Sequence, residues 1–455
     1  MRTSILLISI LFSSQISGAQ DILQQAKQNY VQGRTYVRFS AAEISKGKIK
    51  LYPDSVSDQT IYEIASVTKT FFSLILAHAV IEKKVALTDD IRKYLPGQFP
   101  NLAYKNHPVQ LIHMVNLTSS LPDNFPAGSD FMEQLHLAKP DTLPGLMPRH
   151  SNVAAALLGK ILENIYHASD SALLVTYITA PLGMKHTGFS IPTVDSGLLA
   201  KGYDGYGKQA PYIPFSAGAS GGLHSTIGDM AVYVKYQLDE TDSAVRMTHR
   251  LCWGDPYDFA VGMNWYLGET GDGKRTLRDD GSTYGFASYI QLYPDQHYGL
   301  LLMVNERDTT GNNRLGNMAT DIFSRTFYSD AERASDGFGF SSSINKLLAE
   351  LKKSGFDQAI PVYRKLKTTD PGFFLRENEI NNWGYSLSGK NRKREALEIF
   401  RLNIYLFPNS WNVYDSYGEM LLAAGDKAQA RRMYQKSVEL NPNNKNGKKI
   451  LESIK

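Results

Sequence analysis

The stretch YEIASVTKTFFS, residues 62–73, places a serine and a lysine three positions apart at the start of an apolar run. Residues at this spacing lie on the same face of a helix, so Ser66 and Lys69 can touch. Nucleophilic catalysis needs a hydroxyl beside a group that can take its proton. A helix N-terminus would stabilise negative charge near Ser66, and burial would lower the pKa of Lys69. A capping serine beside a solvated lysine would explain the same residues equally well.

The Ser-x-x-Lys spacing is not specific by itself, because it occurs three times in the chain. Ser45 and Lys48 lie in EISKGKIK, where a glycine and alternating charges predict a turn between strands. Ser343 and Lys346 lie at the edge of a segment rich in serine and glycine. Only Ser66 directly precedes a long apolar run, which predicts a helix.

Composition restricts the class of protein. A chain of 455 residues with 42% hydrophobic residues predicts two or three packed domains. The net charge of +4 is small for this length, so we expect neither a nucleic-acid partner nor a membrane-surface protein. Cys252 is the single cysteine, which excludes an intramolecular disulfide, and the ten histidines show no metal-binding spacing. We therefore expect no metal and no other cofactor.

The first residues are typical of a secretory signal. Arg2 precedes the apolar run SILLISILF, residues 4–12, which is too short to span a bilayer. Ser17 and Ala19 are small residues spaced for cleavage before Gln20. We expect a signal peptide over residues 1–19, a periplasmic or secreted bacterial protein, and no membrane span, since no later apolar run is long enough.

The remaining chain divides by pattern into three parts. Residues 20–328 alternate helical and strand-like runs, which predicts one mixed α and β domain. Within it, helices are expected over residues 70–84, 153–166 and 227–238, and a β-hairpin over residues 285–306 that turns at DQH. Residues 329–343 are rich in Ser, Gly and Asp and are expected to form a linker.

Residues 344–455 contain an internal repeat. Four positions recur after 34 residues: Gly384, Ala396, Phe400 and Pro408 match Gly418, Ala430, Tyr434 and Pro442. A poorer copy lies upstream, with Leu347 at the glycine position. The pattern resembles tetratricopeptide repeats, which stack helical hairpins into a surface for a protein partner or a neighbouring domain. An ordinary amphipathic helical hairpin is the alternative.

The segment around Ser66 resembles the nucleophile motif of the serine β-lactamase and penicillin-binding-protein superfamily, in particular its class C β-lactamase-like and D,D-peptidase-like members. Five further blocks resemble that family in order: residues 109–123 (VQLIHMVNLTSSLPD, with Ser120 at a glycine position), 144–152 (PGLMPRHSN), 180–189 (APLGMKHTGF), 220–234 (SGGLHSTIGDMAVYV) and 278–294 (RDDGSTYGFASYIQLYP). The resemblance covers residues 36–328. It implies an α/β (α+β) fold, in which helices flank an antiparallel sheet and a helical insert forms one wall of the site.

The resemblance also implies roles for individual residues. Ser66 would be the acyl-accepting nucleophile and Lys69 its general base. Asn152 would hydrogen-bond to Lys69 and to the substrate. The backbone N–H groups of Ser66 and Ser282 would form the oxyanion hole. Gly281 stands at the glycine of the family's His/Lys-x-Gly motif, in the wall that binds substrate.

Two positions depart from the family pattern. His150 stands where the family has a proton-relaying tyrosine, and Asp279 stands where it has lysine or histidine. Histidine titrates near neutral pH, and an aspartate could hold its second ring nitrogen. We therefore predict a Ser66–Lys69–His150–Asp279 site. Decay of the site to a binding module is the alternative, although Ser66, Lys69 and Asn152 are all present.

The aspartate also bears on the substrate. Penicillins and peptides ending in D-Ala-D-Ala present a carboxylate, which Asp279 would repel. The sequence thus favours an exported serine hydrolase that cleaves an ester or an amide without a free carboxylate, in a small molecule or a peptide. The competing interpretation is a non-catalytic module that binds cell-wall peptides, or protein partners through its repeats.

Overall fold

The computed structural model describes residues 22–190, 193–213, 215–256, 258–307, 309 and 313–454. The signal peptide expected over residues 1–19 lies outside them. Two compact units form: one of Met1–Gly268 and Arg275–Ser329, the other of Glu269–Lys274 and Asp330–Lys455. No helix in the described part of the chain is both long enough and apolar enough to cross a membrane.

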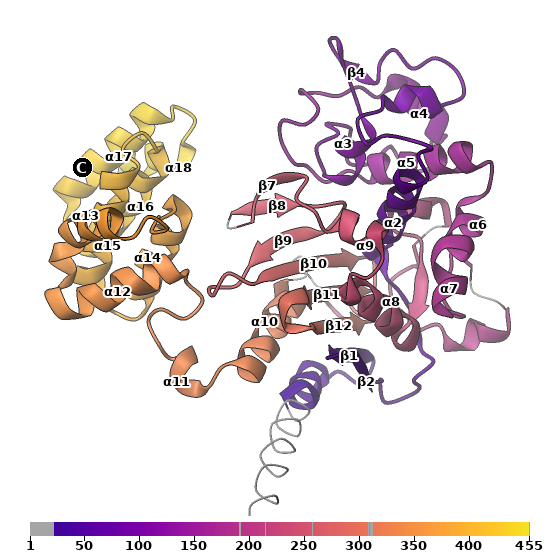
Figure 1. Cartoon of the computed structure of the whole chain (residues 1–455), viewed down its shortest axis with the longest axis horizontal. Coiled ribbons are helices and arrows are strands. Elements are labelled where there is room, and N and C mark those ends of the chain that lie inside the picture. Colours follow the sequence, from indigo (N-terminus) through magenta and orange to yellow (C-terminus); the bar gives the residue numbers. More distant parts are fainter. Residues whose placement is uncertain are drawn as a thin grey trace, which may run out of the picture. The chain divides into compact units, whose positions relative to one another are not determined.

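An eight-stranded sheet organises the first unit, with strand order β2-β1-β12-β11-β10-β9-β8-β7 (Figure 1). β11 and β12 form the predicted hairpin and pair antiparallel from Ala287 opposite Val304 to Tyr293 opposite Tyr298. β1 returns from the start of the domain to pair antiparallel with β12. The strands are β1 (Phe39–Ser45), β2 (Lys48–Tyr52), β7 (Trp253–Asp255), β8 (Phe259–Val261), β9 (Tyr266–Glu269), β10 (Arg275–Ser282), β11 (Ala287–Tyr293) and β12 (Tyr298–Val304).

Helices cover both faces of this sheet. Successive residues of a strand point to opposite faces, so alternate residues enter two different cores. Ile44 and Met303 belong to the core that contains α2, α5 and α8. Ala41 and Leu302 belong to the core that contains α10 and the helix of residues 22–31. The helices are α2 (Thr68–Ile81), α3 (Leu111–Val115), α4 (Phe131–Leu137), α5 (Asn152–Tyr166), α6 (Asp170–Leu174), α7 (Ala180–Leu182), α8 (Ile227–Asp239), α9 (Ser243–Thr248) and α10 (Asn313–Phe327).

The insert that forms the second wall lies in the chain between β3 (Ile61–Glu63) and β6 (His224–Thr226), which pair with each other. Its central helix α2 is apolar on most sides and almost wholly buried, as expected for a helix inside a core. β4 (Ala103–Tyr104) and β5 (His107–Pro108) form a small hairpin within the insert. The fold is thus the antiparallel sheet with flanking helices that the resemblance implied.

The second unit consists of helices in consecutive pairs. A Cβ atom on Gly384 would lie 2.7 Å from the ring of Phe400, and one on Gly418 would lie 3.1 Å from the ring of Tyr434. The expected linker is partly helical, because α11 and the start of α12 fall within residues 329–343. The helices are α11 (Asp330–Arg333), α12 (Ser342–Ser354), α13 (Ala359–Thr369), α14 (Glu377–Gly389), α15 (Lys393–Leu406), α16 (Trp411–Ala423), α17 (Lys427–Leu440) and α18 (Lys445–Ser453).

Candidate active site

Ser66 lies in the single turn Ala65–Val67 that leads from β3 into α2. Ala65 has the left-handed backbone conformation, with φ of 51°, which costs an alanine about 1–3 kcal/mol. Such strain persists only where the surrounding structure imposes it. Ser66 is not the capping residue of α2, since Val67 occupies that position without a side-chain hydrogen bond. The Ser66 hydroxyl is therefore not engaged in capping the helix.

Lys69 lies one turn further on and is 5% exposed. Its Nζ lies 2.9 Å from Ser66 Oγ, and it donates to Asn152 Oδ1 at 2.9 Å and to the carbonyl oxygen of Ser220 at 2.5 Å. Burial lowers the pKa of Lys69 to about 8, although the carboxylates of Asp279 and Asp123 oppose this shift. About a tenth of the amine is therefore neutral at pH 7, and about half at pH 8.

Asn152 is the first residue of α5, and the capping hydroxyl of Ser151 accepts the N–H of Ala154. The side chain of Asn152 bridges two groups, because its Oδ1 accepts from Lys69 while its Nδ2 donates to Asn124 Oδ1 at 3.0 Å. The amide is thereby held in one orientation with its oxygen toward the lysine.

His150 lies two residues before this helix and pairs with Asp123, not with Asp279. Its Nδ1 lies 2.6 Å from Asp123 Oδ1, in a pair whose side chains are 45% and 56% exposed. Burial and the nearby Lys69 lower the pKa of His150, and Asp123 and Asp280 oppose this shift. The prediction that Asp279 holds this ring is therefore wrong. Asp279 lies on β10, where its charge opposes the lowering of the Lys69 pKa, and the segment between α3 and α4 supplies the partner of the ring through Asp123.

The loop that carries Asp123 is joined to the start of α5 by backbone contacts. Ser151 Oγ donates to the carbonyl oxygen of Pro122 at 2.6 Å. The N–H of Asn152 donates to the carbonyl oxygen of Asp123 at 2.8 Å. Ser120, at a family glycine position, has φ of 58°, the conformation that glycine adopts at least cost. The hydrogen bonds of Ser151 and Asn152 to this loop hold His150 beside Asp123.

Strand β10 approaches the nucleophile from the sheet side. A Cβ atom on Gly281 would lie 2.6 Å from the carbonyl oxygen of Ile64 and 2.7 Å from the backbone nitrogen of Ser66. Only glycine permits this approach without displacement. Ser288 of β11 also donates from Oγ to the Ile64 carbonyl oxygen at 2.8 Å. Ser282 is the next residue of β10 after Gly281, so its backbone lies beside this close contact with Ser66.

Asp279 lies deeper on β10 and is 6% exposed. Burial, and to a smaller extent Asp280, raises the pKa of its carboxyl well above the usual range, while Lys69 opposes the shift. Among the described residues, none hydrogen-bonds to its Oδ2. Arg278 and Asp280 alternate with it along the strand and form an exposed pair at 3.2 Å.

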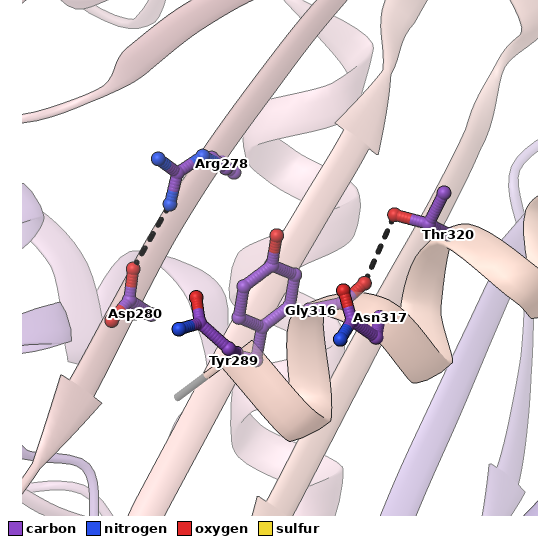
Figure 2. Close-up of a pocket in the computed structure, with 7 residues that line it drawn as sticks. Arg278, Asp280, Tyr289, Gly316, Asn317 and Thr320 are labelled. Atoms are coloured by element: carbon purple, nitrogen blue, oxygen red, sulfur yellow. Dashed lines mark hydrogen bonds and ion pairs between the residues drawn. The ribbon is translucent and has the colours of Figure 1, made fainter. Parts of the chain in front are cut away.

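These side chains line one cavity of about 320 Å³. A smaller polar cavity of about 190 Å³ lies beside it, between β10, β11 and α10, and shares Asp280 with it. Figure 2 shows Arg278 and Asp280 on one strand, with Tyr289 beside them and Asn317 and Thr320 on the helix. The larger cavity is lined by Ser66, Lys69, Leu117, His150, Asn152, Val261, Asn264, Tyr266, Asp279, Asp280, Gly281 and Ser282.

The site residues predicted from the sequence thus line one cavity. Three of their hydrogen-bond partners were not predicted. Asp123, Asn124 and the Ser220 carbonyl did not follow from motif spacing, although Asp123 ends a block that resembles the family. No three His, Cys, Asp or Glu side chains within the described ranges are grouped as metal ligands. The chemistry available to the site is that of a hydroxyl, an amine of lowered pKa and an imidazole–carboxylate pair.

Known proteins resemble this chain in sequence and in fold. Residues 26–323 match the family model described as Beta-lactamase, so the chain belongs to the β-lactamase family of serine hydrolases. It is 24% identical to a "Beta-lactamase" of Pseudomonas fluorescens over 63% of this chain and 93% of that protein. It is 26% identical to "Protein flp" of Staphylococcus aureus over 55% of this chain, and the match spans about half of that relative, 53%.

A solved structure has the same architecture. The "Beta-Lactamase/D-Alanine Carboxypeptidase" of Pseudomonas syringae aligns with a TM-score of 0.60 and 18% identity. The alignment covers 67% of this chain and 98% of that one. At this identity the likeness establishes the fold, which includes the antiparallel sheet and its flanking helices.

Proposed function

We propose that this protein is a serine hydrolase that cleaves an ester or amide bond through an acyl-enzyme on Ser66. The contact of Lys69 Nζ with Ser66 Oγ at 2.9 Å is the observation that carries the proposal. A nucleophile needs a base within hydrogen-bond distance that is neutral at the working pH. Burial lowers the pKa of Lys69 to about 8, so the amine supplies such a base increasingly as the pH rises toward that value.

Acylation follows from this geometry. Ser66 Oγ attacks the substrate carbonyl carbon while its proton passes to neutral Lys69. The resulting oxyanion is stabilised by the backbone N–H groups of Ser66 and Ser282, which Gly281 allows to approach each other. The bond to the leaving group then breaks, and the leaving group takes a proton from the Lys69 ammonium. Asn152 holds the amine in place through its Oδ1.

Deacylation is assigned to His150. The family's tyrosine is absent, and the ring held by Asp123 is a base near neutral pH because the pKa of His150 is lowered. His150 takes a proton from water as the water oxygen attacks the acyl carbon. The bond between the acyl carbon and Ser66 Oγ then breaks, the acyl group leaves as a carboxylic acid, and the His150 imidazolium returns to Ser66 Oγ the proton that it took from water. Asp123 is a positioning residue, since it acts through the imidazole.

Export and a partner for the second unit are further parts of the proposal. The apolar run of residues 4–12 supports removal of residues 1–19 and a periplasmic or secreted location. The 34-residue recurrence supports tetratricopeptide-like repeats in residues 344–455 that bind a protein partner. N-terminal sequencing of the secreted chain tests the first statement, and cross-linking in a cell extract tests the second.

Hydrolysis of a chromogenic thioester by the full chain tests the catalytic proposal. Ser66→Ala should reduce turnover by about 10³-fold or more, because the nucleophile is lost. Ser45→Ala is the matched control, because Ser45 and Lys48 have the same spacing at a turn between β1 and β2. Equal rates for Ser66→Ala and wild type, or no hydrolysis by either, would favour the non-catalytic binding module.

A further inference from the structure

Asp279 is a buried carboxyl group with an unsatisfied oxygen. It lines the cavity beside Ser66 and Lys69, yet its Oδ2 has no hydrogen-bond partner in the described ranges. A buried carboxylate is costly unless a cation or hydrogen-bond donors accompany it. Because Asp279 also lines the cavity, a bound molecule can place a positive charge beside its carboxyl group.

The nearby cations are engaged elsewhere. Lys69 directs its Nζ to three oxygens of Ser66, Asn152 and Ser220. Arg278 lies over the ring of Tyr266 at 4.6 Å and pairs with Asp280. Arg275, at the far end of β10, pairs with carboxylates outside the cavity, those of Glu240 and Asp295. Asp279 therefore has no hydrogen-bonded cation among the described residues, and Lys69 acts on it only through its charge.

The remaining wall suits a cation. Asp280 is the next lining residue on β10, and Asp123 lies behind the ring of His150. Tyr266 also lines the cavity, and the face of its ring that Arg278 does not cover can attract an alkylammonium ion. The charged groups that line the cavity are thus Lys69, Asp279 and Asp280, beside the titratable ring of His150, and an anionic substrate would meet the repulsion of the two carboxylates.

We infer that this site selects substrates that carry a positively charged amine or quaternary ammonium group, and that Asp279 is the residue that recognises it. The inference rests on the proposed function and names its substrate class. The raised pKa of the Asp279 carboxyl is consistent with a missing cation. Binding of the cation would favour the ionised carboxylate, so recognition should weaken as the pH falls.

Three thioesters of acetylglycine test the inference. Their leaving groups are thiocholine, its uncharged carbon isostere 3,3-dimethylbutane-1-thiol, and the anionic 3-mercaptopropionate. In a second set the cationic, uncharged and anionic groups are placed on the acyl side, and all three substrates share one neutral thiol as leaving group. Released thiol is measured with a chromogenic disulfide reagent. In at least one set we expect kcat/KM for the cation to exceed that for the isostere by about tenfold or more, equivalent to about 1.4 kcal/mol.

Substitution of Asp279 separates recognition from general damage, because the ratio of two substrates is measured on one protein. Asp279→Asn should bring the cation and its isostere to within threefold of each other, and Asp279→Lys should favour the anion. In the wild-type chain, choline should inhibit hydrolysis of the neutral thioester, and 3,3-dimethylbutan-1-ol should not. This comparison needs no variant to fold.

The outcomes distinguish the inference from the proposed function. Ser66-dependent hydrolysis with equal rates for the cation and the isostere in both sets would overturn the inference alone. An equal loss for all substrates in Asp279→Asn would also overturn it, because Asp279 would then serve only as a counter-ion of Lys69. Rates for all substrates equal to those of Ser66→Ala would overturn the proposed function as well.

Discussion

Replacement of Asp123 by asparagine tests the pair that the structure places behind His150. The perturbation removes a carboxylate 2.6 Å from Nδ1 while keeping the size of the side chain. Because both side chains are about half exposed, solvent screens the pair, and its loss is worth about 1 kcal/mol at most. This corresponds to about a fivefold fall in the rate of the step that uses the imidazole.

The pH dependence carries the sharper signature. Asp123 raises the pKa of His150 and also that of Lys69, so its removal lowers both. Each base then stays neutral to lower pH, and the acid limb of the rate profile moves to lower pH while the plateau falls. Of the other charged groups near His150, Lys69 lowers its pKa and Asp280 raises it, and both are unchanged in the variant.

The assay is steady-state kcat and kcat/KM for a chromogenic thioester between pH 5 and 9. Asp141→Asn is the matched control, because Asp141 pairs with Arg149 at 2.7 Å between α4 and α5 and has the same exposure as Asp123, 56%. We expect the control to behave as wild type. A profile for Asp123→Asn that coincides with that of Asp141→Asn, or an acid limb that moves to higher pH, would refute the role given to the pair.

Three further predictions follow from contacts in the two units. Gly281→Ala should destabilise the chain by about 1–3 kcal/mol and abolish turnover, because its Cβ would overlap the Ile64 carbonyl oxygen; thermal unfolding and hydrolysis measure both. Acylation should rise as Lys69 loses its proton near pH 8, and Lys69→Arg should be inactive at every pH in single-turnover assays, since arginine stays protonated. Gly384→Ala should destabilise the second unit by about 1–3 kcal/mol through the ring of Phe400, with the initial hydrolysis rate unchanged; a wild-type unfolding curve would contradict this.

Local patterns were sufficient for much of the fold. The hydrophobic periodicity of residues 227–238 predicts α8, and the two apolar runs around DQH predict the β11–β12 hairpin. The contact of Ser66 with Lys69 follows from helical spacing, which depends only on neighbouring residues. Linear order of the family blocks, combined with this spacing, was enough to bring Asn152 to the same cavity.

The partner of His150 could not be predicted in this way. Asp123 and Asp279 lie 27 and 129 positions away, and both choices satisfy the chemistry of a carboxylate behind a ring. The outcome depends on Ser151 donating to the Pro122 carbonyl oxygen, a tertiary contact that brings the loop beside the helix. Alternation along β10 then turns Asp279 to the buried face of the strand, where burial raises its pKa.

The most direct test of the central claim is the intact mass of the full chain after reaction with a fluorophosphonate probe, followed by peptide mapping. The account predicts one phosphonyl group per chain, attached to Ser66, with no adduct in Ser66→Ala and normal labelling of Ser45→Ala. Absence of labelling in the wild-type chain, or an adduct that persists in Ser66→Ala, would contradict the claim that Ser66 is the nucleophile.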